Sequence, residues 1–121
     1  MANNINETLD VVMGISGVIA ATIVDSKSGF VLGSRGNSID MEYVSASNTE
    51  LFIALNKINK HMNITEVPED LLITFHKQYH IMLPLKHLRD VFIYVIVDKE
   101  KASLAMALRS LVSVGSKLQL D

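Results

Sequence analysis

The sequence has no cysteine, no tryptophan and only two prolines among its 121 residues. Without cysteine it can form no disulfide, iron–sulfur site or thiol nucleophile, which agrees with a reducing compartment. Its longest uncharged apolar runs, residues 14–24 and 91–97, are shorter than the roughly 20 residues that a membrane-spanning helix needs. The acidic, polar residues 1–10 are unlike a signal or transit peptide. We therefore expect a cytoplasmic protein with no direct membrane insertion.

Charge is also scarce. Charged residues make up 20% of the chain and hydrophobic residues 49%, and the net charge is −2. This composition is typical of a globular protein, and it is too balanced for binding nucleic acid by bulk attraction. The length predicts a single domain over residues 1–121.

Motifs of catalysis are missing as well. The sequence has no phosphate-binding P-loop, no HExxH zinc motif and no GxGxxG dinucleotide motif. The segment that begins at Gly14 and contains Ser16 resembles a nucleophile elbow only superficially, because Val18 stands where that motif requires glycine. We therefore expect no catalytic residue, no cofactor and no enzymatic activity.

Two of the four histidines, His76 and His80, flank a predicted turn. A three-residue loop would make them a cross-strand pair, whereas a two-residue loop would place them on opposite faces. The three-residue loop is favoured because it aligns Leu71, Ile73 and Phe75 with apolar residues of the next strand. A histidine pair without nearby cysteine or carboxylate makes a poor zinc site, so we expect no bound metal.

Hydrophobic periodicity and turn residues divide the chain into helices and strands. The expected helices cover residues 4–13, 40–62 and 98–118, and the expected strands cover residues 17–24, 30–35, 71–76, 79–85 and 91–97. Asn4 with Glu7 is expected to cap the first helix, and Asp98 the last. Gly29 is expected to supply a positive φ in the first hairpin.

Two of the predicted strands, residues 17–24 and 91–97, carry apolar side chains on both faces and so must be covered on both sides. Short connections make consecutive strands neighbours, which places these two in the middle and gives the order 2-1-5-4-3. The expected fold is a three-layer α/β/α sandwich: a five-stranded antiparallel sheet with one long helix on one face and two helices on the other.

The predicted third strand lies at the sheet edge without charge or proline. Natural proteins rarely leave such an edge open, because it is a template for pairing with another chain. The sequence therefore predicts an oligomer.

The long helix has a second unusual feature. A helical wheel predicts a core stripe of Val44, Leu51, Leu55, Ile58 and Met62. Beside this stripe runs an uncharged flank of Ser45, Thr49, Phe52 and Asn56. Ile53 points almost opposite the core stripe, among charged residues. Either loops cover the flank and Ile53, or this helix contacts something besides its own sheet; we favour the second.

The hydrophobic segments of the chain resemble those of the Roadblock (dynein light chain) family. The matching segments are ISGVIAATIVD (residues 15–25), SGFVL (28–32), DLLIT (70–74), YHIMLPL (79–85) and VFIYVIVD (91–98). They are spread over residues 15–98 and follow the family's order. The resemblance implies the three-layer fold and a dimer in which two long helices pack together and two third strands join the sheets. It also implies a non-enzymatic platform for small Ras-like GTPases or an adaptor on larger complexes.

The expected function is accordingly a homodimer, or a heterodimer with a related chain, that binds and regulates a small GTPase. The expected dimer interface comprises Ser45, Thr49, Phe52, Asn56, Leu71, Ile73 and Phe75, and the expected partner-binding residues are Glu42, Thr49, Ile53 and Lys60. The alternative is a small-ligand sensor of the PAS or GAF type. Such a sensor needs polar anchors in its pocket, and the central strands offer mainly Val, Ile and Ala.

Overall fold

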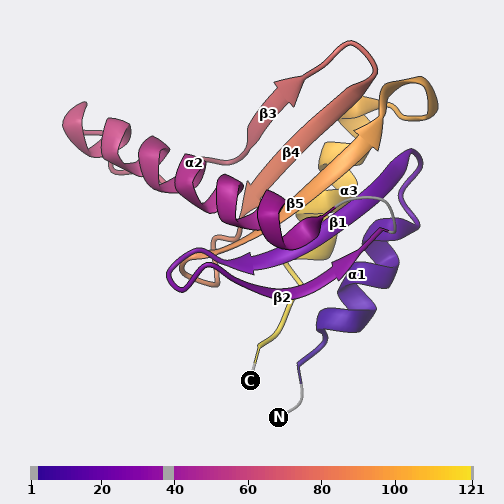
Figure 1. Ribbon diagram of the computed structural model, residues 1–121, viewed down its shortest axis with the longest axis horizontal. Helices are drawn as coiled ribbons and strands as arrows, with labels where there is room; N and C mark the ends of the chain where they lie inside the picture. Colours follow the sequence, from indigo (N-terminus) through magenta and orange to yellow (C-terminus); the bar gives the residue numbers. More distant parts are fainter. Residues whose placement is uncertain (1–2, 37–39, 121) are drawn as a thin grey trace.

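The computed structural model describes residues 3–36 and 40–120. One antiparallel sheet forms the middle of the molecule, with the order β2-β1-β5-β4-β3 that the sequence predicts (Figure 1). The strands are β1 (Val18–Asp25), β2 (Phe30–Arg35), β3 (Leu71–Thr74), β4 (Gln78–Pro84) and β5 (Val91–Asp98). The helices are α1 (Ile5–Met13), α2 (Met41–His61), the short 3-10 helix η1 (Lys99–Lys101) and α3 (Leu104–Gly115).

The helices form two layers around this sheet. Leu9 of α1 and Leu111 of α3 are buried in one core cluster, together with Ile93 and other side chains from one face of the sheet. Phe52 of α2 belongs to a second cluster, with Phe92 and other side chains from the opposite face. The predicted three-layer sandwich is therefore confirmed, with α2 alone on its face of the sheet.

The two central strands explain this layering. Every residue from Ala20 to Val24 and from Val91 to Val97 is buried, so both β1 and β5 are covered on both faces, as predicted. The hairpin between β1 and β2 also closes as expected: Gly29 has a φ of 80°, and its amide donates to the carbonyl of Asp25 over 2.8 Å. Non-glycine residues are strained in this left-handed region.

The helix ends differ from the sequence predictions. The side chain of Asn4 makes no cap on α1. Instead, its Nδ2 donates to the carbonyl of Lys117 over 2.8 Å, and its Oδ1 accepts from the amide of Gln119 over 2.6 Å. Asn4 therefore satisfies backbone groups of the C-terminal segment, a long-range use of its amide that a local capping pattern does not reveal.

Asp98 does not begin the last α-helix, because the chain first makes η1. The carboxylate of Asp98 accepts from the amide of Glu100 over 3.0 Å, whereas Ser103 caps α3 by accepting from Met106 over 3.4 Å. The predicted single helix over residues 98–118 is thus two helices, separated by the extended residue Ala102.

The β3–β4 hairpin has a different register from the predicted one. Ile73 lies opposite His80, and the amide of Phe75 donates to the carbonyl of Gln78 over 2.8 Å, which leaves only His76 and Lys77 in the turn. The predicted His76–His80 pair is therefore wrong. The observed register is shifted from the predicted one by an odd number of residues. Each side chain of β3 therefore shares its face with the other alternate set of β4 side chains.

The rotation of α2 is the largest departure from the sequence prediction. Its buried residues are Met41, Ser45, Asn48, Thr49 and Phe52. Most of the predicted core stripe is wrong, since Ile58 is 54% exposed and Met62 is 63% exposed, and Leu51 is exposed as well. Val44 does pack against the core. On a helical wheel the buried line lies roughly 90° from this stripe. The sheet therefore packs against the flank that was expected to contact a second chain.

This rotation predicts different effects for two neighbouring substitutions in α2. Phe52→Ala removes a buried ring that packs against Phe92 and should lower the free energy of unfolding by about 3–5 kcal/mol. Ile53→Ala changes an exposed side chain and should lower it by less than about 0.5 kcal/mol. Urea unfolding at equal protein concentration measures both, and equal losses would contradict the observed rotation.

Candidate functional site

The contact between α2 and its own sheet defines what the rest of this helix can bind. The hydroxyls of Ser45 and Thr22 lie 3.3 Å apart, and Thr22 also donates to the carbonyl of Gly33 over 3.1 Å. The hydroxyl of Thr49 donates to the carbonyl of Ser45 over 2.8 Å. The ring centroids of Phe52 and Phe92 are 5.7 Å apart.

This contact corrects the dimer interface that was expected from the sequence. Ser45, Thr49 and Phe52 are buried between α2 and the sheet of their own protomer. Asn56 is exposed but lines a cleft beneath α2. The sequence did not indicate that Ser45 and Thr49 belong to the core, because their side chains are polar. Their hydroxyls are hydrogen-bonded within the chain, so they can be buried at little cost.

Among residues 3–36 and 40–120, nothing covers an apolar surface on α2. We name Leu51, Leu55, Ile58 and Met62 the exposed stripe, in which Leu55 is half-buried and the other three side chains are exposed. These residues lie along one side of α2, and Figure 1 shows that the C-terminal part of the helix extends past the sheet. Val44 lies on the same side about two turns nearer the N-terminus, and both Val44 and Leu71 of β3 pack against the core cluster beneath α2. The exposed stripe therefore faces the β3 side of the molecule.

The outer edge of β3 is also free, since no strand of the described chain pairs with it. Phe75 bonds inward to β4, so alternation along the antiparallel ladder directs the amides of Leu72 and Thr74 outward. Leu71 and Ile73 are half-buried, and Phe75 is 50% exposed. The predicted edge strand is confirmed, although it ends at Thr74 rather than at His76.

A histidine–tyrosine pair lies between this edge and α2. Tyr94 bonds through its hydroxyl to Nδ1 of His80 over 2.5 Å, and Nε2 of His80 lies 3.1 Å from Oε1 of Gln78. The ring of Phe75 packs over the imidazole, with centroids 4.7 Å apart. If Nε2–H donates to Gln78 and Tyr94 donates to Nδ1, both ring nitrogens of a neutral imidazole are satisfied.

Burial changes the acidity of both groups. It lowers the pKa of His80, because the charged imidazolium loses hydration. It raises the pKa of Tyr94, an effect that a hydrogen bond from Asn48 of α2 partly opposes. No sequence pattern indicated this pair, since its formation depends on the β3–β4 register and on the rotation of α2.

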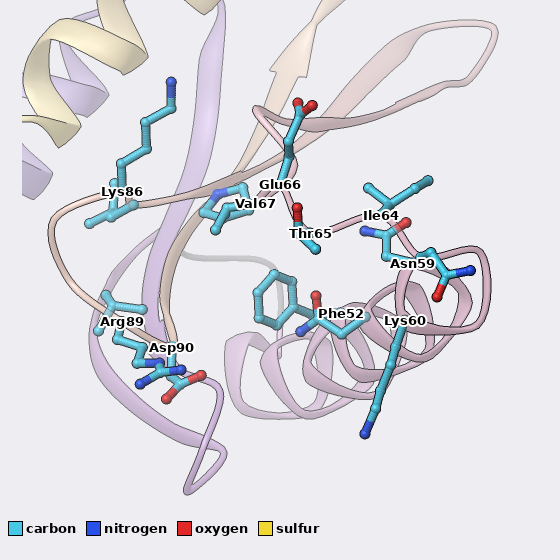
Figure 2. Close-up of a pocket in the computed structure, with 15 residues that line it drawn as sticks. Phe52, Asn59, Lys60, Ile64, Thr65, Glu66, Val67, Lys86, Arg89 and Asp90 are labelled. Atoms are coloured by element: carbon cyan, nitrogen blue, oxygen red, sulfur yellow. The ribbon is translucent and has the colours of Figure 1, made fainter.

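A cleft of about 720 Å³ opens beneath the C-terminal part of α2, between residues 63–67 and 84–91. In Figure 2 the ring of Phe52 points into this cleft, whereas Lys60 and Lys86 extend away from it in different directions. Arg89 lies beside Asp90. The charged groups around the cleft therefore do not converge on one point, as a small-ligand site requires.

The residues predicted to bind a partner occupy the other side of α2. Glu42, Ile53 and Lys60 are exposed, and we name them the outer row. On a helical wheel the outer row lies roughly opposite the exposed stripe. Thr49 is buried and does not belong to it, which corrects that prediction.

Two further kinds of site are absent from the described residues. Within residues 3–36 and 40–120, no three His, Asp or Glu side chains gather as a metal site would require. None of the helices in this described part combines the length and the apolar character that crossing a membrane would demand.

Comparison with solved structures identifies the fold. MglB from Myxococcus xanthus superposes with a TM-score of 0.82 at 18% identity, covering 93% of this chain and 89% of that chain. A Roadblock/LC7 domain from Streptomyces avermitilis gives 0.77 at 9% identity, with 90% and 89% covered. The gliding protein MglB from Thermus thermophilus gives 0.72 at 13% identity, with 94% and 90% covered.

Comparison by sequence alone matched no family profile and no curated protein. The identities to the solved structures are low, so these structures establish the fold and leave the function to be argued from this chain. The chain has the Roadblock/LC7 fold, as the resemblance in its sequence predicted.

The His80–Tyr94 pair predicts a pH-dependent stability. A histidine with a lowered pKa in the folded state stabilises fully above its unfolded pKa of about 6.5, and this stability is lost as the pH falls toward the folded value. The free energy of unfolding should therefore fall between about pH 7.5 and pH 5.5. His80→Gln should reduce this loss, whereas His76→Gln, at the exposed hairpin turn, should leave it unchanged. Equal pH profiles for wild type and His80→Gln would contradict the assignment.

Proposed function

We propose that this protein is a homodimeric, non-enzymatic platform that binds and regulates a small Ras-like GTPase. The observation that carries the proposal is the exposed stripe on α2, which lies on the same side of the molecule as the free edge of β3. Several exposed apolar residues in one row, next to a strand edge without a partner, are typical of a protein–protein interface.

Pairing of two β3 edges would use both features at once. Antiparallel pairing about a two-fold axis places the two sheets side by side and brings the two α2 helices together above the joint. Because the exposed stripe faces the β3 side, each stripe would then contact its counterpart. We therefore propose Leu51, Leu55, Ile58 and Met62, together with Leu71, Ile73 and Phe75, as the dimer interface.

The outer row would remain free in this dimer. It lies on the side of α2 away from the exposed stripe, and Ile53 gives it an apolar centre with 44% of its surface exposed. Glu42 and Lys60 supply one charge of each sign on either side of it. The class of partner, a small GTPase, comes from the Roadblock resemblance. MglB from Thermus thermophilus, which has the same fold, is a gliding protein.

The polar groups beneath α2 argue against the sensor alternative. The hydroxyls of Ser45, Thr49 and Thr22 bond to one another or to the backbone, and His80 bonds to Tyr94. These groups are therefore occupied within the chain rather than presented to a ligand. Effects on a bound GTPase would accordingly come from positioning the catalytic groups of the GTPase itself.

Replacing one residue of the exposed stripe should separate the dimer. Ile58→Glu would place a carboxylate in an apolar contact, which costs several kcal/mol, so the dimer dissociation constant should rise by about 100-fold or more. Light scattering at micromolar concentration measures the mass. Ile53→Glu introduces the same charge on the outer row and should leave the dimer intact.

A second variant tests the strand edge. Thr74→Pro removes an outward amide without breaking the β3–β4 ladder and should also weaken the dimer. A dimer that tolerates both Ile58→Glu and Thr74→Pro would contradict the proposed interface. A monomeric wild type would contradict the homodimer and direct the search to a related second chain.

The outer row predicts a separate loss of partner binding. Ile53→Asp should weaken binding to a Ras-like GTPase of the same organism, loaded with a GTP analogue, by about tenfold or more, because it places a charge in an apolar contact. Its mass should remain that of the dimer. Val112→Asp makes the same exchange on α3 and should leave binding unchanged. Unchanged binding by Ile53→Asp, or GTP hydrolysis by the dimer alone, would contradict the proposal.

A further inference from the structure

A groove runs between α1 and α3, on the face of the sheet opposite α2. It has a volume of about 920 Å³. Val11 and Ile15 line it from the α1 side, and Met106 and Val114 line it from α3. We name this feature the α1/α3 groove. Because α2 and β3 lie elsewhere, the dimer and the outer row proposed above would leave it open.

Each wall of the groove carries an exposed apolar side chain. Val11 is 56% exposed and Met106 is 58% exposed, so the two walls each present a large apolar side chain to solvent. Ser110 and Ser113 also line the groove from α3, so part of this wall consists of short side chains. Small residues beside apolar ridges allow another helix to approach closely, and the flexible thioether of Met106 adapts to different partner surfaces.

The charges of the groove all have one sign. Lys101 and Lys117 line it, and none of its described lining residues is acidic. Glu7 lies one turn before Val11 on the same side of α1 but does not line the groove. Asp10 of α1 bonds to Arg35, and Glu100 lines a separate hollow beside Ile19. The two lysines precede and follow α3, about 20 Å apart along its axis.

We propose that the α1/α3 groove binds an amphipathic helix that carries acidic residues at both ends of its apolar face. The apolar walls match one face of such a helix, which is a common mode of peptide recognition. The distance between Lys101 and Lys117 sets the spacing of the acidic residues at about 13 positions along the bound helix. The charges would set orientation and association rate, and the apolar contacts most of the affinity.

A synthetic peptide tests this proposal directly. The probe is a fluorescent helical peptide of about 16 residues, with leucines at positions i, i+3, i+4 and i+7 of one face and two glutamates near each end. Fluorescence anisotropy with the full-length wild-type chain should show saturable binding that weakens as salt rises from about 0.05 M to about 0.5 M. Combining Lys101→Glu with Lys117→Glu should weaken binding about tenfold or more.

Matched controls separate the groove from general attraction. Lys57→Glu reverses an exposed charge on α2, on the opposite side of the sheet, and should change the affinity by less than about twofold. Met106→Ala should weaken binding about fivefold through lost apolar contact. Every substituted side chain is exposed or lies on the rim, so circular dichroism should show an unchanged fold.

Three outcomes would overturn the proposal. The first is no saturable binding up to about 1 mM peptide. The second is equal binding of a peptide in which lysines replace the glutamates. The third is binding of the wild type to phosphatidylglycerol vesicles, abolished by the lysine substitutions, without binding of the peptide. That last result would assign the groove to an anionic membrane surface.

Discussion

The packing of α2 on the central strands decides which surfaces this protein presents. Its buried side combines the Ser45–Thr22 hydroxyl contact with the stacking of Phe52 on Phe92. A different rotation of α2 would leave the Thr22 hydroxyl without Ser45 and remove the ring of Phe52 from the core. Because all faces of a helix turn together, this one contact also places the exposed stripe toward β3 and the outer row away from it.

Apolar residues of α2 follow a heptad-like spacing that continues past the contact with the sheet. The row consists of Met41, Val44, Leu51, Leu55, Ile58 and Met62, with the polar residue Asn48 between Val44 and Leu51. Met41 and Asn48 are buried beneath the helix, whereas Ile58 and Met62 are exposed where α2 extends beyond the sheet (Figure 1). Alternating spacings of three and four residues are typical of helix–helix packing. The N-terminal half of the row thus serves the fold, and the C-terminal half is available for another helix.

The layers and the strand order were predictable because they depend on strong, redundant signals. Two strands with both faces apolar must be central, and short connections leave one arrangement. The rotation of α2 was not predictable by the same reasoning. Hydrophobicity selects the most apolar side as the core, whereas this helix uses a side with hydrogen-bonded hydroxyls for the sheet and leaves much of its apolar side exposed. The hairpin register failed for a related reason: Leu72, Ile73 and their neighbours are apolar on both faces, so alternation did not distinguish the registers.

The filled sheet has a consequence for how partners on the two faces can influence each other. Between the α2 face and the α1/α3 groove lie β1 and β5, whose central residues are buried on both sides. Close-packed strands of this kind resist small displacements. Occupants of the two faces would therefore bind without steric conflict and with little energetic coupling. The fold is accordingly better suited to holding two partners together on one rigid support than to transmitting a conformational signal between them.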